Sequence, residues 1–488
     1  MSRLRTTEEG TPGGSAAREG AHRASSTQRE PQRPPQRERY LRRARLADSL
    51  ETIVWLTVAL VLALFLADSG FVEFKTVPGT FTALGIIAGL VGTDLMLIQL
   101  LLAARLPVID RAFGHDHALL VHQRMGKPVF YLISAHMLLL WMGYALTARL
   151  NVFTEIWDMF TTLPDMKIAY LGYGLLTVVV ITSLVIVRRK FPYEAWHVVH
   201  FLAYAAVLAA LPHQFSTGQL FADGTWARYY WLALYFGVAT GLLIYRFIVP
   251  VLRTLRHDLR VSNVVTEAPG VYSIEMTGRS LADLRVRGGQ FFIWRFWSRG
   301  LWWHAHPFSL SAAPGILRLK VTVRELGGGT SELGALRIGT RVSIEGPYGL
   351  FTDRARTTRR AVAVAAGIGI TPIISLLEQG DFAPGEMTVI VRAPDKEGLY
   401  LHQELQKLCN KKSVALYVLL GRRPKKGHDS WLPAREASRH VDLSTIVPDV
   451  RDADVFVCGP RGWTDLVVED AKQAGVPKFR IHYERFSW

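Results

Sequence analysis

Six apolar stretches of membrane length dominate the first half of this 488-residue chain. None of them contains Asp, Glu, Lys or Arg, and about 20 such residues in a row are enough to cross a hydrocarbon core as an α-helix. The whole chain is 49% hydrophobic, which is high for a soluble protein of this size. We therefore expect six membrane spans. The expected spans are Thr52 to Ala67, Thr76 to Thr93, Pro128 to Ala148, Ile168 to Val187, Ala195 to Ala222 and Tyr229 to Tyr245.

Basic residues are unevenly distributed between the ends of these spans. Lys and Arg precede the first span, lie between the second and third and between the fourth and fifth, and follow the sixth, whereas the other links carry Asp and Glu. Positive residues are retained in the cytoplasm. The pattern predicts a multi-pass protein of the cell membrane with both termini cytoplasmic.

The first 48 residues are rich in Arg, Ser, Pro, Gln and Glu and have no apolar period. Such a composition predicts a disordered basic tail at residues 1–48. The formal net charge of +16 reflects basic residues that cluster in this tail and beside the spans. We therefore expect the lipid bilayer to be the partner of this charge, and no nucleic acid.

Two pairs of histidines lie along the third and fifth apolar segments. His122 and His136 are fourteen residues apart, and His200 and His213 are thirteen apart, so each pair extends about 20 Å along a helix. Ionisable side chains inside a bilayer are costly and mark function. Two parallel spans with such pairs can hold two stacked haems, an inner one between His122 and His200 and an outer one between His136 and His213. Iron with two imidazole ligands transfers electrons and has no open position for a substrate.

Several alternatives remain for this region. His197 lies three residues before His200 and is a rival ligand. A spacing of thirteen does not restore the same helical face, so His213 needs a distorted helix, for which Pro212 is the candidate. Asp94 interrupts the second span, where it can partner an arginine, carry protons or make structural hydrogen bonds.

The second half of the chain has a different pattern. Residues 253–355 form short alternating apolar runs broken by glycines, which predicts a small antiparallel β-barrel. Residues 356–488 contain four strands with intervening helices, which indicates a doubly wound parallel sheet with its ligand site at the carboxyl ends of the strands. The turn Gly367-Ile-Gly-Ile-Thr-Pro372 follows the first of these strands, and the last strand runs into Cys458-Gly-Pro460.

The turn at residues 367–372 has features of a phosphate-binding helix start. Thr371 suits the N-cap and Pro372 the first helical position, and the glycines let backbone N–H groups approach a pyrophosphate. The spacing departs from the usual Gly-x-Gly-x-x-Gly dinucleotide pattern. On these residues alone, an ordinary loop is an equal alternative.

Four motifs, in this order after a six-span region that bears histidines, resemble the NADPH oxidase and ferric reductase superfamily. They are His306-Pro-Phe-Ser309, Gly346-Pro-Tyr-Gly349, the 367–372 turn and Cys458-Gly-Pro460. The resemblance covers residues 50 to 488. It implies a ferric reductase-like transmembrane domain with two b-type haems, fused to a ferredoxin-reductase-type module that binds FAD and NADPH or NADH. No EF-hand loop precedes the spans, so calcium control is not expected.

The resemblance also implies roles for individual residues. Arg392 follows the second sheet strand, where it would meet a 2′-phosphate and favour NADPH, or else lie in a solvated loop. Cys458 would approach the nicotinamide, and Trp488, with Phe486 as the alternative, would stack on the flavin; ordinary strand packing is the other reading of these two aromatic residues. The implied FAD-binding residues are His306, Pro307, Phe308, Ser309 and Thr330. The implied nicotinamide nucleotide residues are Gly367, Gly369, Thr371, Pro372, Arg392, Gly459 and Pro460.

The sequence as a whole predicts a multi-domain membrane protein. It consists of a six-helix transmembrane bundle at 49–252, an antiparallel β-barrel flavin domain at 253–355 and an α/β doubly wound nucleotide domain at 356–488. The expected enzyme passes electrons from cytoplasmic NAD(P)H through FAD and two bis-histidine haems to oxygen, forming superoxide, or to ferric iron outside. Delivery of electrons to a partner protein is an alternative. A proton or ion transporter is a third, which leaves the flavin and nicotinamide motifs unexplained.

Overall fold

The computed structural model describes residues 36–184, 187, 193–218, 224–424 and 430–486. Within these residues, six helices are long and apolar enough to cross a membrane, as the sequence predicted, so the chain is a multi-pass membrane protein. The six candidate spans are Glu38–Asp68, Val77–Ala103, His115–Ala148, Met166–Ser183, Glu194–Thr217 and Trp226–His257. The elements of this half are α1 (Gln36–Phe65), η1 (Leu66–Gly70), α2 (Phe71–Glu73), α3 (Val77–Ala103), α4 (Pro107–Phe113), α5 (His115–Ala148), α6 (Val152–Thr162), α7 (Met166–Ser183), α9 (Tyr193–His200), α10 (Leu202–Thr217), α11 (Trp226–Leu242), η3 (Leu243–Ile248) and α12 (Val249–His257).

Two helices begin earlier than the sequence predicted. Helix α1 starts at Gln36, so the predicted disorder is wrong for residues 36–48, while residues 1–35 lie outside the described part of the chain. Arg, Leu, Ala and Glu in this stretch are good helix formers that extend the helix already formed by the span. Helix α5 starts at His115 and runs through Pro128, which removes only one backbone donor from a long helix.

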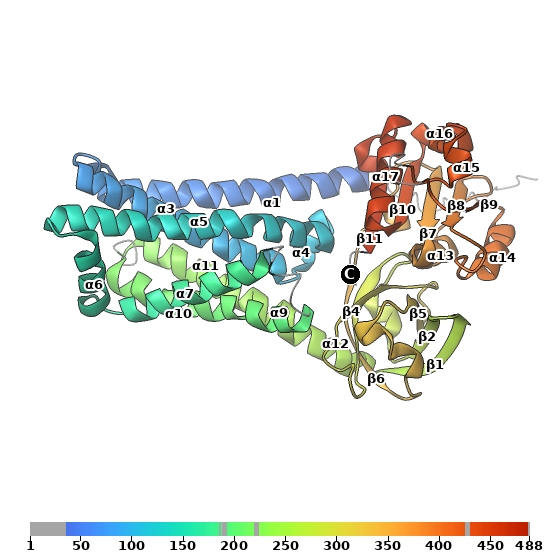
Figure 1. Ribbon diagram of the computed structural model, residues 1–488, viewed down its shortest axis with the longest axis horizontal. Coiled ribbons are helices and arrows are strands. Elements are labelled where there is room, and N and C mark those ends of the chain that lie inside the picture. Colours follow the sequence, from blue (N-terminus) through green and yellow to red (C-terminus); the bar gives the residue numbers. More distant parts are fainter. Residues whose placement is uncertain (1–35, 185–186, 188–192, 219–223, 425–429, 487–488) are drawn as a thin grey trace, which may run out of the picture. The chain divides into compact units, whose positions relative to one another are not determined.

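Helix α3 lies at the centre of the membrane half. It packs against α1, α5 and α11, and Figure 1 shows α3 and α5 running alongside each other. Gly89 permits this close approach, because a Cβ atom at that position would lie 2.4 Å from Nδ1 of His136 on α5. Small residues at such contacts allow membrane helices to come together closely.

The fifth span is interrupted between its two histidines of interest. Helix α9 ends at His200 and α10 begins at Leu202, so Phe201 separates them. The N–H of Phe201 donates to the carbonyl of Val198 as well as to that of His197, and the N–H of Tyr204 donates to the carbonyl of Phe201. The bonds to Val198 and Phe201 span three residues, as in a turn tighter than the α-helix. Pro212, the candidate for a distortion before His213, lies inside α10. The turn at Phe201 changes the rotation of the helix between His200 and His213.

Residues 259–348 form the predicted antiparallel barrel. Its sheet has the strand order β4-β3-β6-β1-β2-β5, and a bridge between Leu310 and Val321 joins the two ends of this order. Phe292, Trp294 and Phe296 alternate along β3 and point into a fully buried core. The strands are β1 (Leu259–Ala268), β2 (Val271–Thr277), β3 (Phe291–Phe296), β4 (His306–Ser309), β5 (Arg318–Arg324) and β6 (Arg341–Tyr348).

The last part of the chain is the predicted parallel α/β domain, with five strands in the order β11-β10-β7-β8-β9. Alternate residues of β7 enter separate cores on the two faces of the sheet. Helices α13 and α14 contribute to the core on one face, and α17 contributes to the core on the other. The elements are β7 (Ala361–Ala366), η8 (Gly367–Gly369), α13 (Ile370–Gln379), β8 (Met387–Ala393), α14 (His402–Lys412), β9 (Ala415–Leu420), α15 (Ala434–Ala437), α16 (Leu443–Ile446), β10 (Asp454–Pro460), α17 (Arg461–Gln473) and β11 (Ile481–Phe486).

Candidate functional site

The inner pair of histidines comes together in the membrane half. The ring centroids of His122 on α5 and His200 on α9 lie 6.1 Å apart. A metal–imidazole bond of about 2 Å on each side, together with the radii of the two rings, gives a separation of about 6 Å. The two rings are therefore spaced as they are when both bind one metal ion. The residues fit a bis-histidine haem at this position.

Backbone carbonyls of α3 orient both histidines of α5. Nδ1 of His122 lies 2.9 Å from the carbonyl oxygen of Gln99, and Nδ1 of His136 lies 2.8 Å from that of Gly85. A carbonyl only accepts, so Nδ1 of each ring donates and Nε2 keeps its lone pair. Metal-binding histidines characteristically donate their second nitrogen in this way. Sequence reasoning missed these two partners, because every residue has a carbonyl and side-chain chemistry gives no signal.

The other histidines of the fifth span differ in their surroundings. His213 lies inside α10. The ring of His200 stacks on Trp196 at 4.9 Å, and its Nδ1 lies 3.4 Å from the hydroxyl of Ser183. His197 instead packs edge-on against Phe201 at 4.6 Å. This geometry favours His200 over His197 as the partner of His122.

The His306-Pro-Phe-Ser309 motif forms strand β4 at the edge of the barrel sheet. The rings of His306 and Phe308 are stacked at 5.3 Å, and Phe308 and Pro307 are only partly buried. Burial and the nearby His304 lower the pKa of His306 to about 4, so its ring is neutral at pH 7. Its buried Nε2 has no hydrogen-bond partner among the described residues. A buried nitrogen without a partner is expected where a ligand completes the site.

Glu484 is a buried acid that the sequence analysis did not identify. Its Oε2 accepts a hydrogen bond of 3.3 Å from Ser309, while Oε1 has no partner among the described residues. Parallel pairing of β10 with β11 places it beside Cys458. Burial raises the pKa of Glu484 well above its usual value, because a low-dielectric surrounding disfavours the charged carboxylate.

Cys458 is completely buried at the end of β10. Burial raises the pKa of its thiol well above the usual value, so it is a neutral thiol and not a reactive thiolate. Ser309, Cys458 and Glu484 come from three separate strands. The fold therefore joins the barrel motif to the Cys458-Gly-Pro460 motif through one buried polar group.

The glycine turn after β7 lies directly against the backbone of Cys458. A Cβ atom on Gly369 would lie 2.2 Å from the carbonyl oxygen of Cys458, so only glycine permits this approach. The turn is a short 3-10 helix, and Gly367 has a φ of 56°. The predicted N-cap is wrong: helix α13 starts at Ile370, which places Thr371 and Pro372 inside its first turn. The hydroxyl of Thr371 donates to the carbonyl of Ile368 and closes the turn.

The other predicted nucleotide residues lie at strand ends or in turns. Arg392 in β8 donates to the carbonyl of Gly421, and its Nε has no partner among the described residues. Burial and the nearby Arg423 lower the pKa of Arg392. The hydroxyl of Thr330 donates to the carbonyl of Gly327 within its own turn. Trp488 and the side chain of Phe486, the alternative to it, lie outside the described residues. Gly459 and Pro460 are described and lie at the end of β10.

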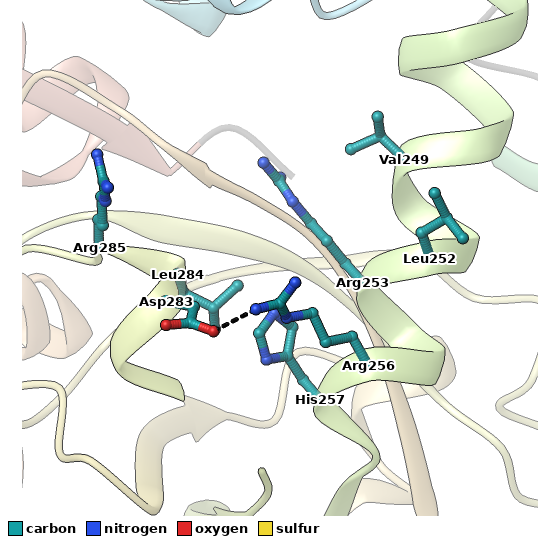
Figure 2. Close-up of a pocket in the computed structure, with 8 residues that line it drawn as sticks. All are labelled: Val249, Leu252, Arg253, Arg256, His257, Asp283, Leu284 and Arg285. Atoms are coloured by element: carbon teal, nitrogen blue, oxygen red, sulfur yellow. Dashed lines mark hydrogen bonds and ion pairs between the residues drawn. The ribbon is translucent and has the colours of Figure 1, made fainter. Parts of the chain in front are cut away.

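A separate pocket lies beside α12 and η4 (Leu281–Leu284) (Figure 2). It is lined by three arginines, and one of them, Arg256, forms an ion pair with Asp283. None of its lining residues belongs to the predicted motifs, so the motifs and not this pocket define the candidate site. The lining residues are Val249, Leu252, Arg253, Arg256, His257, Asp283, Leu284 and Arg285.

Comparison with known proteins gives separate matches for the two halves. Residues 88–211, which include His122, His136 and His200, match the family described as ferric reductase like transmembrane component. The chain is also similar to the flavohemoprotein of Xylella fastidiosa (strain 9a5c), with 26% identity over 210 residues, 41% of this chain and 51% of that protein. It is also similar to the ferredoxin reductase component of the 3-ketosteroid-9-alpha-monooxygenase of Rhodococcus rhodochrous, with 28% identity over 237 residues, 47% of this chain and 64% of that protein.

A solved structure also matches part of this chain. The flavohem-like FAD/NAD binding domain of nitric oxide dioxygenase from Vibrio cholerae is 22% identical and matches 47% of this chain and 98% of that chain, with a TM-score of 0.39. The chain spans between half and two thirds of the length of the two curated relatives. The chain thus combines a region that matches the ferric reductase like transmembrane family model with similarity to a flavohemoprotein and to a ferredoxin reductase component.

Proposed function

We propose that this protein passes electrons from cytoplasmic NAD(P)H across the membrane to an acceptor on the outer face. The observation that carries the proposal is the pair His122 and His200, whose rings are 6.1 Å apart. The hydrogen bond from Nδ1 of His122 to α3 supports it, because this bond leaves Nε2 available to a metal. Two such pairs at different depths provide two positions for electron transfer.

The cofactors supply chemistry that the side chains lack. When bound, FAD accepts a hydride and releases single electrons, and two b-type haems, one between His122 and His200 and one between His136 and His213, transfer those electrons one at a time. The chain positions these groups and controls their surroundings. We propose His306, Pro307, Phe308, Ser309 and Thr330 for FAD, and the 367–372 turn with Arg392 and Cys458-Gly-Pro460 for the nicotinamide nucleotide.

Glu484 has a specific role in this scheme. Hydride donation and single-electron release leave protons to be moved, and a buried neutral acid can exchange one at Oε1. Ser309 fixes the carboxyl through Oε2, and the free Oε1 faces no described protein partner. The neutral thiol of Cys458 beside it excludes water and adds no charge.

The orientation of the chain in the membrane belongs to the same proposal. Lys and Arg concentrate at the ends of the spans from which the reductase module extends. The positive-inside rule then places both termini and the module in the cytoplasm. Electrons would leave at the His136 and His213 end. Oxygen, giving superoxide, and ferric complexes are the proposed acceptors there.

Haem ligation can be tested with optical spectra of the purified protein. Dithionite-reduced minus oxidised spectra should show a low-spin b-type haem, and His122→Ala should remove the signal of one haem. His117→Ala is a matched control, because His117 lies on the same helix but is exposed. A protein without a haem signal, or a His122→Ala variant with unchanged spectra, would contradict the proposal.

The acceptor can be identified by a separate assay. NADPH oxidation is measured in air and under argon, with and without a ferric chelate, and superoxide is detected by a signal that superoxide dismutase abolishes. Loss of turnover under argon identifies oxygen. Turnover that needs added iron and is insensitive to oxygen identifies a ferric reductase.

A further inference from the structure

Asp94 is a fully buried carboxyl in the middle of α3. A carboxyl inside a bilayer is costly and indicates a function. Its neighbours come from two other helices: Thr57 of α1 lies 3.0 Å from Oδ2, and the hydroxyl of Tyr230 on α11 donates to Oδ1 at 3.2 Å. No proposed cofactor residue takes part in this group.

The hydrogen bonds of Thr57 allow two protonation states without movement of heavy atoms. Its Oγ1 lies 2.8 Å from the carbonyl of Val54 and 3.0 Å from Asp94, but a hydroxyl has only one hydrogen. With Asp94 protonated, the acid donates to Thr57, and Thr57 donates to Val54. With Asp94 ionised, the hydroxyl rotates and donates to the carboxylate. Both arrangements satisfy Asp94, so only hydrogens need to move when the proton binds or leaves.

The position of Asp94 relates this group to the two histidine pairs. Gly85 and Gln99 of the same helix hold His136 and His122. Asp94 lies between them, about 13.5 Å along the helix from Gly85 and about 7.5 Å from Gln99. The titratable groups that face α3 here are therefore Tyr230 of α11 and the two histidines of α5, while α1 presents Thr57.

We propose that Asp94 binds a proton when an electron enters the membrane domain and releases it when the electron leaves. This inference rests on the proposed electron transfer. An added electron inside a medium of low dielectric constant is destabilised by a nearby negative charge, and protonation of the Asp94 carboxylate removes that charge. For each electron, one O–H bond forms on a carboxylate oxygen with a proton taken from water. That bond breaks again when the electron passes to the acceptor.

The test is a redox titration of the purified holoprotein at several pH values. In the wild type the midpoint potential of at least one haem should fall as pH rises, by up to about 59 mV for each tenfold decrease in proton concentration. Asp94→Asn keeps the hydrogen bonds of the neutral acid and should abolish this dependence. Asp68→Asn, at an exposed acid beyond the end of α1, is the matched control and should retain it.

Infrared spectra give a readout that does not depend on turnover. Reduced minus oxidised spectra should contain a carboxyl C=O band that shifts in D2O and disappears in Asp94→Asn. Thr57→Val keeps the carboxyl but removes a donor to the carboxylate, so the pH dependence should persist and move to higher pH. A pH-independent wild type, or Asp94→Asn with the wild-type slope, would overturn the proposal. Absence of any haem signal would instead refute the electron-transfer proposal on which it rests.

Discussion

Gly369→Ala should separate the two turns of the proposed nicotinamide site. The new Cβ would lie 2.2 Å from the carbonyl oxygen of Cys458 and 2.9 Å from the nitrogen of Gly459. Both are backbone atoms of β10 and cannot rotate away. Ordinary contact begins at 3.4 Å, so the turns must move apart by about 1.2 Å. Since a misplacement of about 1 Å costs on the order of 100-fold in rate, we expect kcat/KM for NAD(P)H to fall about 100-fold, or about 2.7 kcal/mol.

The assay for this variant is NAD(P)H-dependent reduction of ferricyanide, a soluble acceptor that reports on the flavin half. Gly462→Ala is the matched control, because a Cβ there, on α17, meets nothing within 4 Å. It should leave kcat/KM unchanged. Flavin content and thermal unfolding of both variants are measured in parallel. A Gly369→Ala variant with normal flavin content and wild-type kcat/KM would refute the argument from close approach.

Three further predictions concern single side chains. His200→Ala should reduce the haem absorbance to roughly half, because one iron loses a ligand, whereas His197→Ala should retain it; the opposite result would exchange their roles. Arg392→Ala should raise KM for NADPH about 10- to 100-fold, the value of a charge-assisted hydrogen bond, and leave KM for NADH unchanged; equal effects on both would remove Arg392 from the 2′-phosphate site. Because the pKa of Glu484 is raised in the folded protein, folding takes up a proton above about pH 4.3, where the unfolded chain has lost it, and the stabilisation is lost as pH rises toward the folded pKa. The thermal midpoint of the wild type should therefore fall relative to that of Glu484→Gln as pH rises from 5 to 8. Thermal midpoints of the two proteins that change equally with pH would show that Glu484 is already ionised.

The membrane spans and the class of each domain were predictable from the sequence. The length of an apolar run and the alternation of apolar and polar residues can each be read within a single segment of the chain. The break at Phe201 was not, since neither Gly nor Pro marks it and Pro212 offered a stronger local signal. Glu484 was missed for another reason. It is one charged residue in a C-terminal strand, and only its parallel pairing with β10 brings it to Cys458.

The start of α13 shows how a preference can be overridden. Thr and Pro at 371 and 372 favour a helix start, but the 3-10 turn at η8 already has a helical backbone at Gly369. The helix therefore begins before Thr371, whose hydroxyl then serves the preceding turn. The turn lies directly after β7, as predicted, although the local roles of Thr371 and Pro372 differ from the prediction.

Helix α3 contributes no proposed ligand, yet it holds His122 and His136 through its own carbonyls. A small slide of α3 along its axis would turn both imidazole rings in the same sense. The electronic properties of the two proposed haem positions therefore both depend on the position of helix α3 and are not set independently. A substitution that shifts this helix, even far from either histidine, should change both potentials together.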